Sequence, residues 1–317
     1  MTVMRIVFCG SGDFGLPTLR ALVAGPHEIA GVITQPARRA GRGGRPRPTP
    51  VAAAAEELHL PARPVEDVNA PAVVADLAAL GADLMLVADF GQMIRKPARR
   101  ACRLRAYNLH GSVLPALRGA APVNWAIIRG LSETGVTVFR LIGRMDAGAI
   151  FARRATAIDP SETAEELRAR LADLGVEAVD ETLAGLAAGR TDGEPQDDSA
   201  ATFAPLLSKA DGVIDFAADA VTIRNLVHGT WPWPGARARY VAPSGKACDA
   251  ILARAAAHPG DAGGPPGTIA ADGTIATGGG RLEVLAIKPA GKRLMAWRDF
   301  VNGYRAGPGA RFDSVAR

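Results

Sequence analysis

The sequence predicts an α/β protein in which an open, mostly parallel sheet is followed by a small β-barrel. Over residues 5–188, short continuous apolar runs alternate with helical segments, as expected when strands are buried on both faces of a parallel sheet. The first apolar run ends in a glycine-rich turn. Beyond residue 206, glycine and proline closely punctuate short strand-like segments, which is typical of a small barrel.

The elements of the first half follow from local pattern. Strands are expected at uninterrupted apolar runs, and we predict them at Arg5–Cys9, Ile29–Thr34, Asp83–Ala88, Arg105–Leu109, Val136–Ile142 and Ala149–Ala157. Pro50 suits the first turn of a helix, because the N–H that proline lacks has no partner there. We predict helices at Leu16–Ala24, Pro50–Leu58, Ala70–Leu80, Ala121–Arg129 and Thr163–Ala188.

A polar stretch without periodicity, residues 190–206, is interpreted as a linker. It separates an N-terminal domain, residues 1–189, from a C-terminal domain, residues 207–317. In the C-terminal domain we predict strands at Ala236–Val241, Cys248–Ala255, Gly267–Ala271, Gly273–Thr277 and Leu282–Ile287, with helices at Ala218–His228 and Leu294–Tyr304.

The composition excludes several classes of protein. The chain has 317 residues, 48% of them hydrophobic and 22% charged, which suits two globular domains rather than a disordered chain. Its three cysteines are far apart, so they form neither a disulfide scaffold nor a CxxC metal knuckle. No apolar run approaches the ~20 residues of a membrane span, and the N-terminus does not resemble a secretory signal. We therefore expect a cytoplasmic protein without a metal site.

Positive charge is unevenly distributed. The formal net charge is +5, and residues 206–317 hold 14 Lys and Arg against 9 Asp and Glu, whereas residues 1–205 hold 23 of each. The segment Pro36–Pro50 nevertheless contains no acid. It is either a solvated loop that reflects composition alone or a basic arm that binds phosphates. Its five arginines are Arg38, Arg39, Arg42, Arg45 and Arg47.

The turn Gly10–Gly15 fits the pattern G-x-G-x-x-G between a strand and a helix. In dinucleotide-binding proteins these glycines let a pyrophosphate approach the helix N-terminus. An NAD enzyme would carry an acid at the end of the second strand, where this chain has Thr34 and Gln35 followed by Arg38 and Arg39. The turn alone is therefore compatible with an NADP-dependent oxidoreductase or with a simple tight turn in an α/β sheet.

Three polar residues in the second half of the sheet suggest chemistry. Asn108 and His110 are two residues apart at the end of a predicted strand, so both side chains leave the same face. Ligands of open α/β sheets bind beyond the carboxyl ends of strands. Asp146, between a strand end and a glycine, could fold back onto the imidazole. Each residue alone is usually a turn residue or a structural polar group. Two donors and a carboxylate together suit formyl or acyl transfer to an amine.

The stretch NLHGSVLPALRGAAP, Asn108–Pro122, closely resembles the motif of the folate-dependent formyltransferases. ETGVT (Glu133–Thr137) and MDAGAI (Met145–Ile150) continue this resemblance. The chain as a whole resembles the methionyl-tRNA formyltransferase family. The matching segments outside the motif are QPARRAGRG (Gln35–Gly43), SKADGVIDF (Ser208–Phe216), WPWPGA (Trp231–Ala236) and LAIKPAGKRLM (Leu285–Met295).

This resemblance implies a Rossmann-like formyltransferase sheet with an OB-like C-terminal barrel that binds tRNA. It implies 10-formyltetrahydrofolate as donor, the α-amino group of initiator methionyl-tRNA as acceptor, and no bound nicotinamide or metal. Asn108, His110 and Asp146 would carry the chemistry, in a protein expected to be a monomer. The residues implied to line the folate site are Ser112, Val113, Leu114, Pro115, Phe90 and Ile94, and those implied to contact tRNA are Arg38, Arg39, Arg42, Arg45 and Arg47.

The sequence departs from the family pattern in two places. Residues 88–92 read ADFGQ where Ala-Tyr-Gly is commoner, and residues 144–149 read RMDAGA in place of the usual Leu-Asp-Thr-Gly-Asp. The second departure leans toward the sugar-nucleotide formyltransferases, so N-formylation of a UDP-4-amino sugar is the alternative function. Those enzymes typically lack a glycine- and arginine-rich loop like Arg38–Arg47, which favours tRNA as the acceptor.

Overall fold

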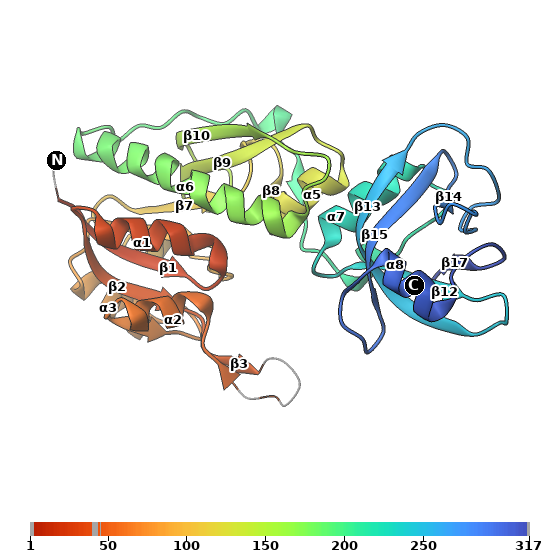
Figure 1. Ribbon diagram of the computed structural model, residues 1–317. Coiled ribbons are helices and arrows are strands. Elements are labelled where there is room, and N and C mark those ends of the chain that lie inside the picture. Colours follow the sequence, from red (N-terminus) through yellow and green to blue (C-terminus); the bar gives the residue numbers. More distant parts are fainter. Residues whose placement is uncertain (1–2, 40–43, 45, 316–317) are drawn as a thin grey trace. The chain divides into compact units, whose positions relative to one another are not determined.

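The structure is a computed structural model that describes residues 3–39, 44 and 46–315 (Figure 1). The described residues divide into two compact units. The first unit draws on Met1–Gly119, Thr134–Thr156 and Arg168–Phe203. The second unit draws on Ala120–Glu133, Ala157–Leu167 and Ala204–Arg317.

The central sheet lies almost entirely in the first unit and has seven strands in the order β10-β9-β7-β6-β1-β2-β5. The strands from β7 to β5 pair in parallel, and β9 pairs antiparallel with β7, which confirms the predicted open, mostly parallel sheet. The strands are β1 (Arg5–Gly10), β2 (Glu28–Thr34), β5 (Ala62–Pro64), β6 (Leu84–Ala88), β7 (Ala106–His110), β9 (Glu133–Arg140) and β10 (Ile150–Ala157).

Four helices of this region begin and end close to the predicted boundaries: α1 (Leu16–Ala24), α2 (Pro50–Glu57), α3 (Pro71–Ala79) and α6 (Ala164–Ala187). The short helix α4 (Lys96–Arg99) and the 3-10 turn η1 (Asp13–Gly15) before α1 were not predicted. Local chemistry explains the start of α2. The Thr49 hydroxyl accepts a hydrogen bond from the Ala52 N–H at 3.0 Å, and Pro50 occupies the first helical position.

The register of the parallel strands positions the candidate site. Gly10 at the end of β1 lies beside Ala88 at the end of β6, and Ala88 lies beside Leu109 near the end of β7. Three chain segments therefore leave the sheet at one edge, which is where open α/β sheets bind ligands. They are the glycine turn after β1, the loop after β6 and the loop after β7.

The second unit contains an antiparallel sheet in the order β14-β15-β13-β12-β17, with β16 paired to β15, and this confirms the predicted C-terminal barrel. Its core contains a cluster of aromatic rings: the ring of Tyr240 lies 5.1 Å from that of Phe300 and 5.5 Å from that of Phe312. The elements are α5 (Pro122–Ile128), η3 (Lys209–Gly212), α7 (Ala220–Thr230), β12 (Ala236–Val241), β13 (Ala247–His258), β14 (Ile275–Ala276), β15 (Arg281–Pro289), β16 (Met295–Ala296), α8 (Trp297–Tyr304) and β17 (Arg311–Ser314).

Two predicted elements of the barrel were wrong. The strand expected at Gly267–Ala271 is absent from the described chain, where only single bridges join Thr268 to Arg311 and Ile269 to Ile275. Gly267 has a φ of +86°, which breaks an extended run before it can form a ladder. The last helix begins at Trp297 rather than Leu294, since Met295 and Ala296 pair with β15.

None of the helices in the described ranges is long and apolar enough to cross a membrane.

His228, on α7, is a buried histidine in the second unit, only 1% exposed. Its Nε2 accepts a hydrogen bond from the Ala255 N–H at 3.2 Å, so the neutral ring carries its proton on Nδ1. Burial, with the nearby positive charges of Arg224 and Arg254, lowers the pKa of His228 from 6.5 to about 4. The folded protein therefore keeps the ring neutral at a pH where the unfolded chain already binds a proton.

We predict that the second unit loses stability as the pH falls from 6.5 to 4, by up to about 1.4 kcal/mol per pH unit from His228. The unfolded chain binds more protons than the folded chain in this window, so acid favours unfolding. His228→Gln retains an acceptor for the Ala255 N–H and should remove this contribution. Tryptophan fluorescence during urea unfolding measures the effect, because all four tryptophans lie in the second unit.

The control is His258→Gln, at an exposed histidine of the same unit, which should retain the loss of stability that comes from His228. A His228→Gln variant with the wild-type slope would contradict the assignment.

Candidate active site

Strand β7 delivers two polar side chains to the carboxyl edge of the sheet. Asn108 is partly exposed, and its side-chain amide has no hydrogen-bond partner among the residues that the structure describes. His110 is 6% exposed. A partly exposed, unpartnered amide beside a buried imidazole leaves one donor available to a ligand.

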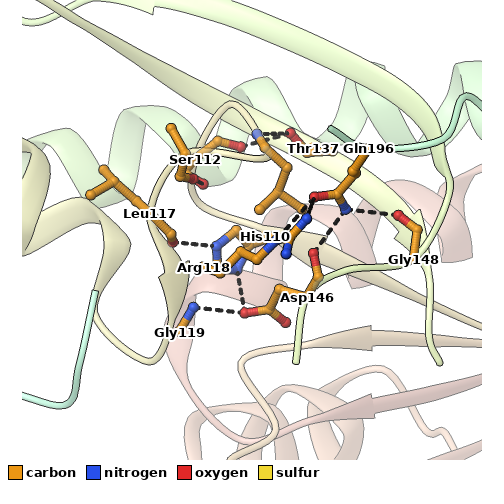
Figure 2. A network of polar contacts seen from close by, with 11 residues as sticks. His110, Ser112, Leu117, Arg118, Gly119, Thr137, Asp146, Gly148 and Gln196 are labelled. Carbon is orange, nitrogen blue, oxygen red and sulfur yellow. Dashed lines mark hydrogen bonds and ion pairs between the residues drawn. The ribbon is translucent and has the colours of Figure 1, made fainter. Parts of the chain in front are cut away.

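The two ring nitrogens of His110 face different partners (Figure 2). Nε2 lies 3.0 Å from the carbonyl oxygen of Leu117. Because a carbonyl can only accept, Nε2 carries a hydrogen and donates it. Nδ1 lies 3.9 Å from Oδ2 of Asp146, longer than a hydrogen bond. Nδ1 is therefore the ring nitrogen that faces the carboxylate.

Asp146 is held in place by its own loop contacts. The Gly119 N–H donates to Oδ2 of Asp146 at 2.8 Å, as Figure 2 shows. The backbone of Asp146 is left-handed, with a φ of +47°, which is uncommon for a residue other than glycine. The side chain is 15% exposed. The structure thus brings Asp146 to His110 across 36 residues of chain, as the sequence analysis anticipated.

The loop after β7 is fixed by a threonine of β9. The Thr137 hydroxyl donates to the Ser112 carbonyl at 2.7 Å and accepts from the Leu114 N–H at 3.1 Å. Leu114 is fully buried against Phe139 and Ile150. Of the four residues expected to line a folate site here, Ser112 and Leu114 are buried, whereas Val113 and Pro115 are partly exposed.

The other two residues expected at the folate site, Phe90 and Ile94, are buried in the apolar core of the first unit. Their side chains support the loop after β6 rather than its surface. The carbonyl of Phe90 accepts hydrogen bonds from the Ser11 hydroxyl at 3.1 Å and from the Gln35 amide at 2.8 Å.

The glycine turn is not arranged for a dinucleotide. The Ser11 and Gly12 N–H groups, which would face a pyrophosphate, both donate to the carbonyl of Asp89, at 3.0 and 3.2 Å. The Asp89 carboxylate also fills the space beside Gly12, where a Cβ would lie 1.7 Å from Oδ2. Arg168 pairs with Asp13 and Asp89 and closes this contact. These contacts argue against the oxidoreductase alternative.

The arginine-rich segment begins and ends as a hairpin of two short strands. In β3 (Arg38–Arg39) and β4 (Pro46–Arg47), Arg38 lies directly opposite Arg47. Both side chains are exposed, and neither forms an ion pair with any described residue. Like charges opposite each other destabilise a strand pair. Arg39 contributes its backbone to the pairing, while Arg42 and Arg45 lie outside the described residues.

Three polar residues at the site were missed by the sequence analysis: Arg118, Gln196 and Asp198. Arg118 is 5% exposed; its Nη2 donates to Oε1 of Gln196 at 2.7 Å, and its Nη1 pairs with Asp198 at 2.9 Å. The segment 190–206, interpreted as a linker, therefore carries side chains of the site. The segment is polar and has no periodicity, so its sequence does not distinguish the site residues Gln196 and Asp198 from the residues of a solvent-exposed linker.

Within the described part of the chain, no group of three or more His, Cys, Asp or Glu side chains could hold a metal. The chemistry available at this edge comes from one free amide, one imidazole and one carboxylate. Such a set can donate to a developing oxyanion and move a proton.

Comparison with known proteins identifies the family. Residues 4–183 match the family described as "Formyl transferase", and residues 206–305 match "Formyl transferase, C-terminal domain". The chain is 41% identical over 307 residues to a methionyl-tRNA formyltransferase of Solibacter usitatus, covering 95% of this chain and 96% of the relative. It is 38% identical over 313 residues to that of Geobacter metallireducens, covering 98% and 99%.

A solved structure shares the fold at much lower sequence identity. The sugar 3N-formyltransferase WlaRD, solved with dTDP and 5-N-formyl-THF, aligns with a TM-score of 0.65 over 92% of this chain and 100% of its own, at 13% identity. That identity shows the shared fold only, whereas the two full-length relatives show the family. The chain belongs to the methionyl-tRNA formyltransferases, within the formyl transferase family.

Proposed function

We propose that Asn108, His110 and Asp146 catalyse the reaction of this enzyme, the transfer of a formyl group from 10-formyltetrahydrofolate to the α-amino group of initiator methionyl-tRNA. One observation carries the assignment: Nδ1 of His110 and Oδ2 of Asp146 face each other, 3.9 Å apart, at the sheet edge where Asn108 presents an unpartnered amide. Full-length relatives of the same name support the reaction.

In this proposal each side chain has a separate task. The amide of Asn108 donates to the formyl oxygen as negative charge develops on it. Nε2 of His110 is committed to the Leu117 carbonyl, so Nδ1 is the nitrogen that acts on the reacting groups. Asp146 accepts a proton from the attacking amine or stabilises the charge on the imidazole.

The reaction balances without a redox step. The donor supplies an activated formyl carbon on N10 of the folate. A new C–N bond forms from the acceptor amine to that carbon, and the bond from the carbon to N10 breaks. The proton lost by the amine passes to N10 through Asp146 and His110. We propose no metal in this scheme.

The folate site is proposed along the loops after β6 and β7. Val113 and Pro115 are partly exposed and could contact the ligand. The buried side chains pack beneath the surface of the two loops and support them; they are Ser112, Leu114, Phe90 and Ile94. A folate would therefore meet backbone groups of these loops more than the buried side chains. This division explains how residues 88–92 can differ from the commoner family sequence.

The arginine hairpin is proposed to bind the acceptor tRNA. The facing pair Arg38 and Arg47 carries charge that no described acidic residue neutralises, and such a pair is stabilised by phosphates. Arg39, Arg42 and Arg45 would extend the same charge. The surplus of positive charge in residues 206–317 would add contacts along the tRNA backbone, so we propose residues 207–317 as a tRNA-binding domain beside a catalytic domain of residues 1–189.

The protein is proposed to act as a monomer in the cytoplasm, the compartment that holds charged tRNA. Size-exclusion chromatography with light scattering would test the monomer, for which the mass expected from the sequence is 32.8 kDa.

Substitution of the three catalytic side chains should lower kcat without weakening substrate binding. We predict that Asn108→Ala, His110→Ala and Asp146→Asn each reduce kcat by about 10²–10³-fold, because each removes a donor or proton acceptor used in the transition state. Steady-state formylation kinetics, with tRNA affinity measured separately, check this. The combined variant should lose far less than the product of the single losses, because the three groups act together. Near-wild-type kcat in Asp146→Asn would remove Asp146 from the mechanism.

Neutralising the hairpin should weaken tRNA binding in a salt-dependent way. We predict that replacing Arg38 and Arg47 by Ala lowers the magnitude of the log K against log[salt] slope by roughly 0.7–0.9 for each phosphate that is no longer bound. Replacing all five arginines of the segment should lower it further, while folate binding stays unchanged. Affinity for methionyl-tRNA across a salt series measures both variants.

A matched control removes two arginines that are already neutralised in the same unit. Arg20 pairs with Glu57 at 3.3 Å and Arg63 pairs with Asp76, so Arg20→Ala with Arg63→Ala makes the same change in charge and should leave the slope nearly unchanged. Equal slopes for all variants, together with formylation of a UDP-4-amino sugar and none of methionyl-tRNA, would overturn tRNA as the acceptor.

A further inference from the structure

The Asp146 turn is a strained segment that needs support from elsewhere in the fold. A residue other than glycine in the left-handed region costs on the order of 1–3 kcal/mol and persists only where its surroundings fix it. Asp146 has such a backbone, with a φ of +47°. The hydrogen bond from Gly119 reaches its carboxylate, but it does not hold the backbone.

Gln196 holds that backbone. Its Nε2 donates to the carbonyl of Asp146 at 2.8 Å and to the carbonyl of Gly148 at 2.7 Å, so one amide ties both sides of the turn (Figure 2). The chain at Gly148 is pressed against β9, because a Cβ there would lie 1.7 Å from the carbonyl oxygen of Arg140. The close approach of Gly148 to β9 and the two hydrogen bonds from Gln196 together restrict the movement of this turn.

Arg118 determines which way the amide of Gln196 points. Its Nε and Nη2 both donate to Oε1 of Gln196, at 3.1 and 2.7 Å, which leaves the NH₂ group to face the Asp146 turn. The guanidinium is itself fixed by Asp198 at 2.9 Å, and Asp198 also pairs with Arg144 at 2.8 Å. This buried charge is therefore paired and hydrogen-bonded.

Arg118 also sits between the two backbone groups that hold the catalytic side chains. The Leu117 carbonyl fixes His110, and the Gly119 N–H fixes the Asp146 carboxylate. The Arg118 N–H donates to the Thr202 carbonyl at 2.8 Å, and this hydrogen bond anchors the stretch Leu117–Gly119. One arginine therefore links the position of the imidazole to the position of the carboxylate.

We propose that Gln196 and Arg118 are positioning residues for the formyl transfer: Gln196 sets the backbone of Asp146 so that its carboxylate faces His110, and Arg118 orients Gln196. The inference rests on the proposed catalytic role of Asp146. It gives the segment 190–206 a function in the chemistry, although neither residue touches the reacting atoms.

The test is a double-substitution cycle on kcat with Gln196→Met and Asp146→Asn. Gln196→Met keeps the side-chain length and removes every hydrogen bond, so kcat should fall by up to about 100-fold, with KM for the folate donor and affinity for tRNA unchanged. Added to Asp146→Asn, it should lower kcat no further, because the carboxylate that it positions is already absent.

Two further variants separate positioning from stability. Gln196→Glu keeps the acceptor for Arg118 but cannot donate to the two carbonyls when ionised. Its kcat should therefore fall at least as far as that of Gln196→Met, while its ion pair with Arg118 should give it the higher Tm of the two variants. Asn225 is the matched control, since its amide oxygen also accepts from an arginine, Arg224, at 2.7 Å. Asn225→Leu should lower the Tm and leave kcat unchanged.

The outcomes separate the positioning role of Gln196 from the proposed catalytic role of Asp146. A low kcat in Asp146→Asn with a wild-type kcat in Gln196→Met and Gln196→Glu would overturn the positioning role alone. Fully additive losses in the double variant would also overturn it, because Gln196 would then act independently of Asp146. A wild-type kcat in Asp146→Asn would overturn the proposed catalytic role and the positioning role with it.

Discussion

The geometry of the site depends on the stretch Leu117–Gly119, whose backbone contacts both His110 and Asp146, the two side chains proposed to exchange protons. The carbonyl of Leu117 takes the proton on Nε2 of His110, and the N–H of Gly119 holds the Asp146 carboxylate. Backbone groups cannot change type by substitution, so they fix the ring and the carboxylate whatever side chains surround them. The stretch itself must be anchored by a side chain, and that side chain is Arg118. Its buried guanidinium binds Gln196 through Nε and Nη2 and Asp198 through Nη1.

Local patterns predicted most of the fold because they are set by local physics. The limits of α1 and β12 match the prediction residue for residue, since a proline lies in the first turn of α1 and the sequence ARARYV of β12 alternates buried with less buried residues. The barrel was harder to predict because its strands are held by partners distant in sequence. β17 pairs with β12 across about 70 residues, and its sequence RFDS carries no alternation that would mark it. Asn108, His110 and Asp146 could be selected from the sequence, but Gln196 could not, because its importance comes only from the two carbonyls that it reaches.

The glycine turn shows how one sequence pattern serves two uses in the same fold. The pattern at Gly10–Gly15 satisfies the dinucleotide fingerprint, yet the Ser11 and Gly12 N–H groups bind the chain's own Asp89 carbonyl. The absence of a side chain at Gly12 makes room for the Asp89 carboxylate rather than for a pyrophosphate. Arg168 forms an ion pair with that carboxylate, so Asp89, which departs from the commoner family sequence, has a charged partner in this chain. The loop after β6 is thereby joined to the loop after β1 at the carboxyl edge of the sheet.

The central claim is that His110 acts through Nδ1 because Nε2 is committed to the Leu117 carbonyl. ¹⁵N NMR of the histidine side chains tests it most directly, with the His110 signals assigned by their absence in His110→Ala. The account predicts that Nε2 of His110 stays protonated across the pH range of activity, and that only the Nδ1 shift responds to Asp146→Asn. A neutral ring with its proton on Nδ1 and a bare Nε2 would contradict the account.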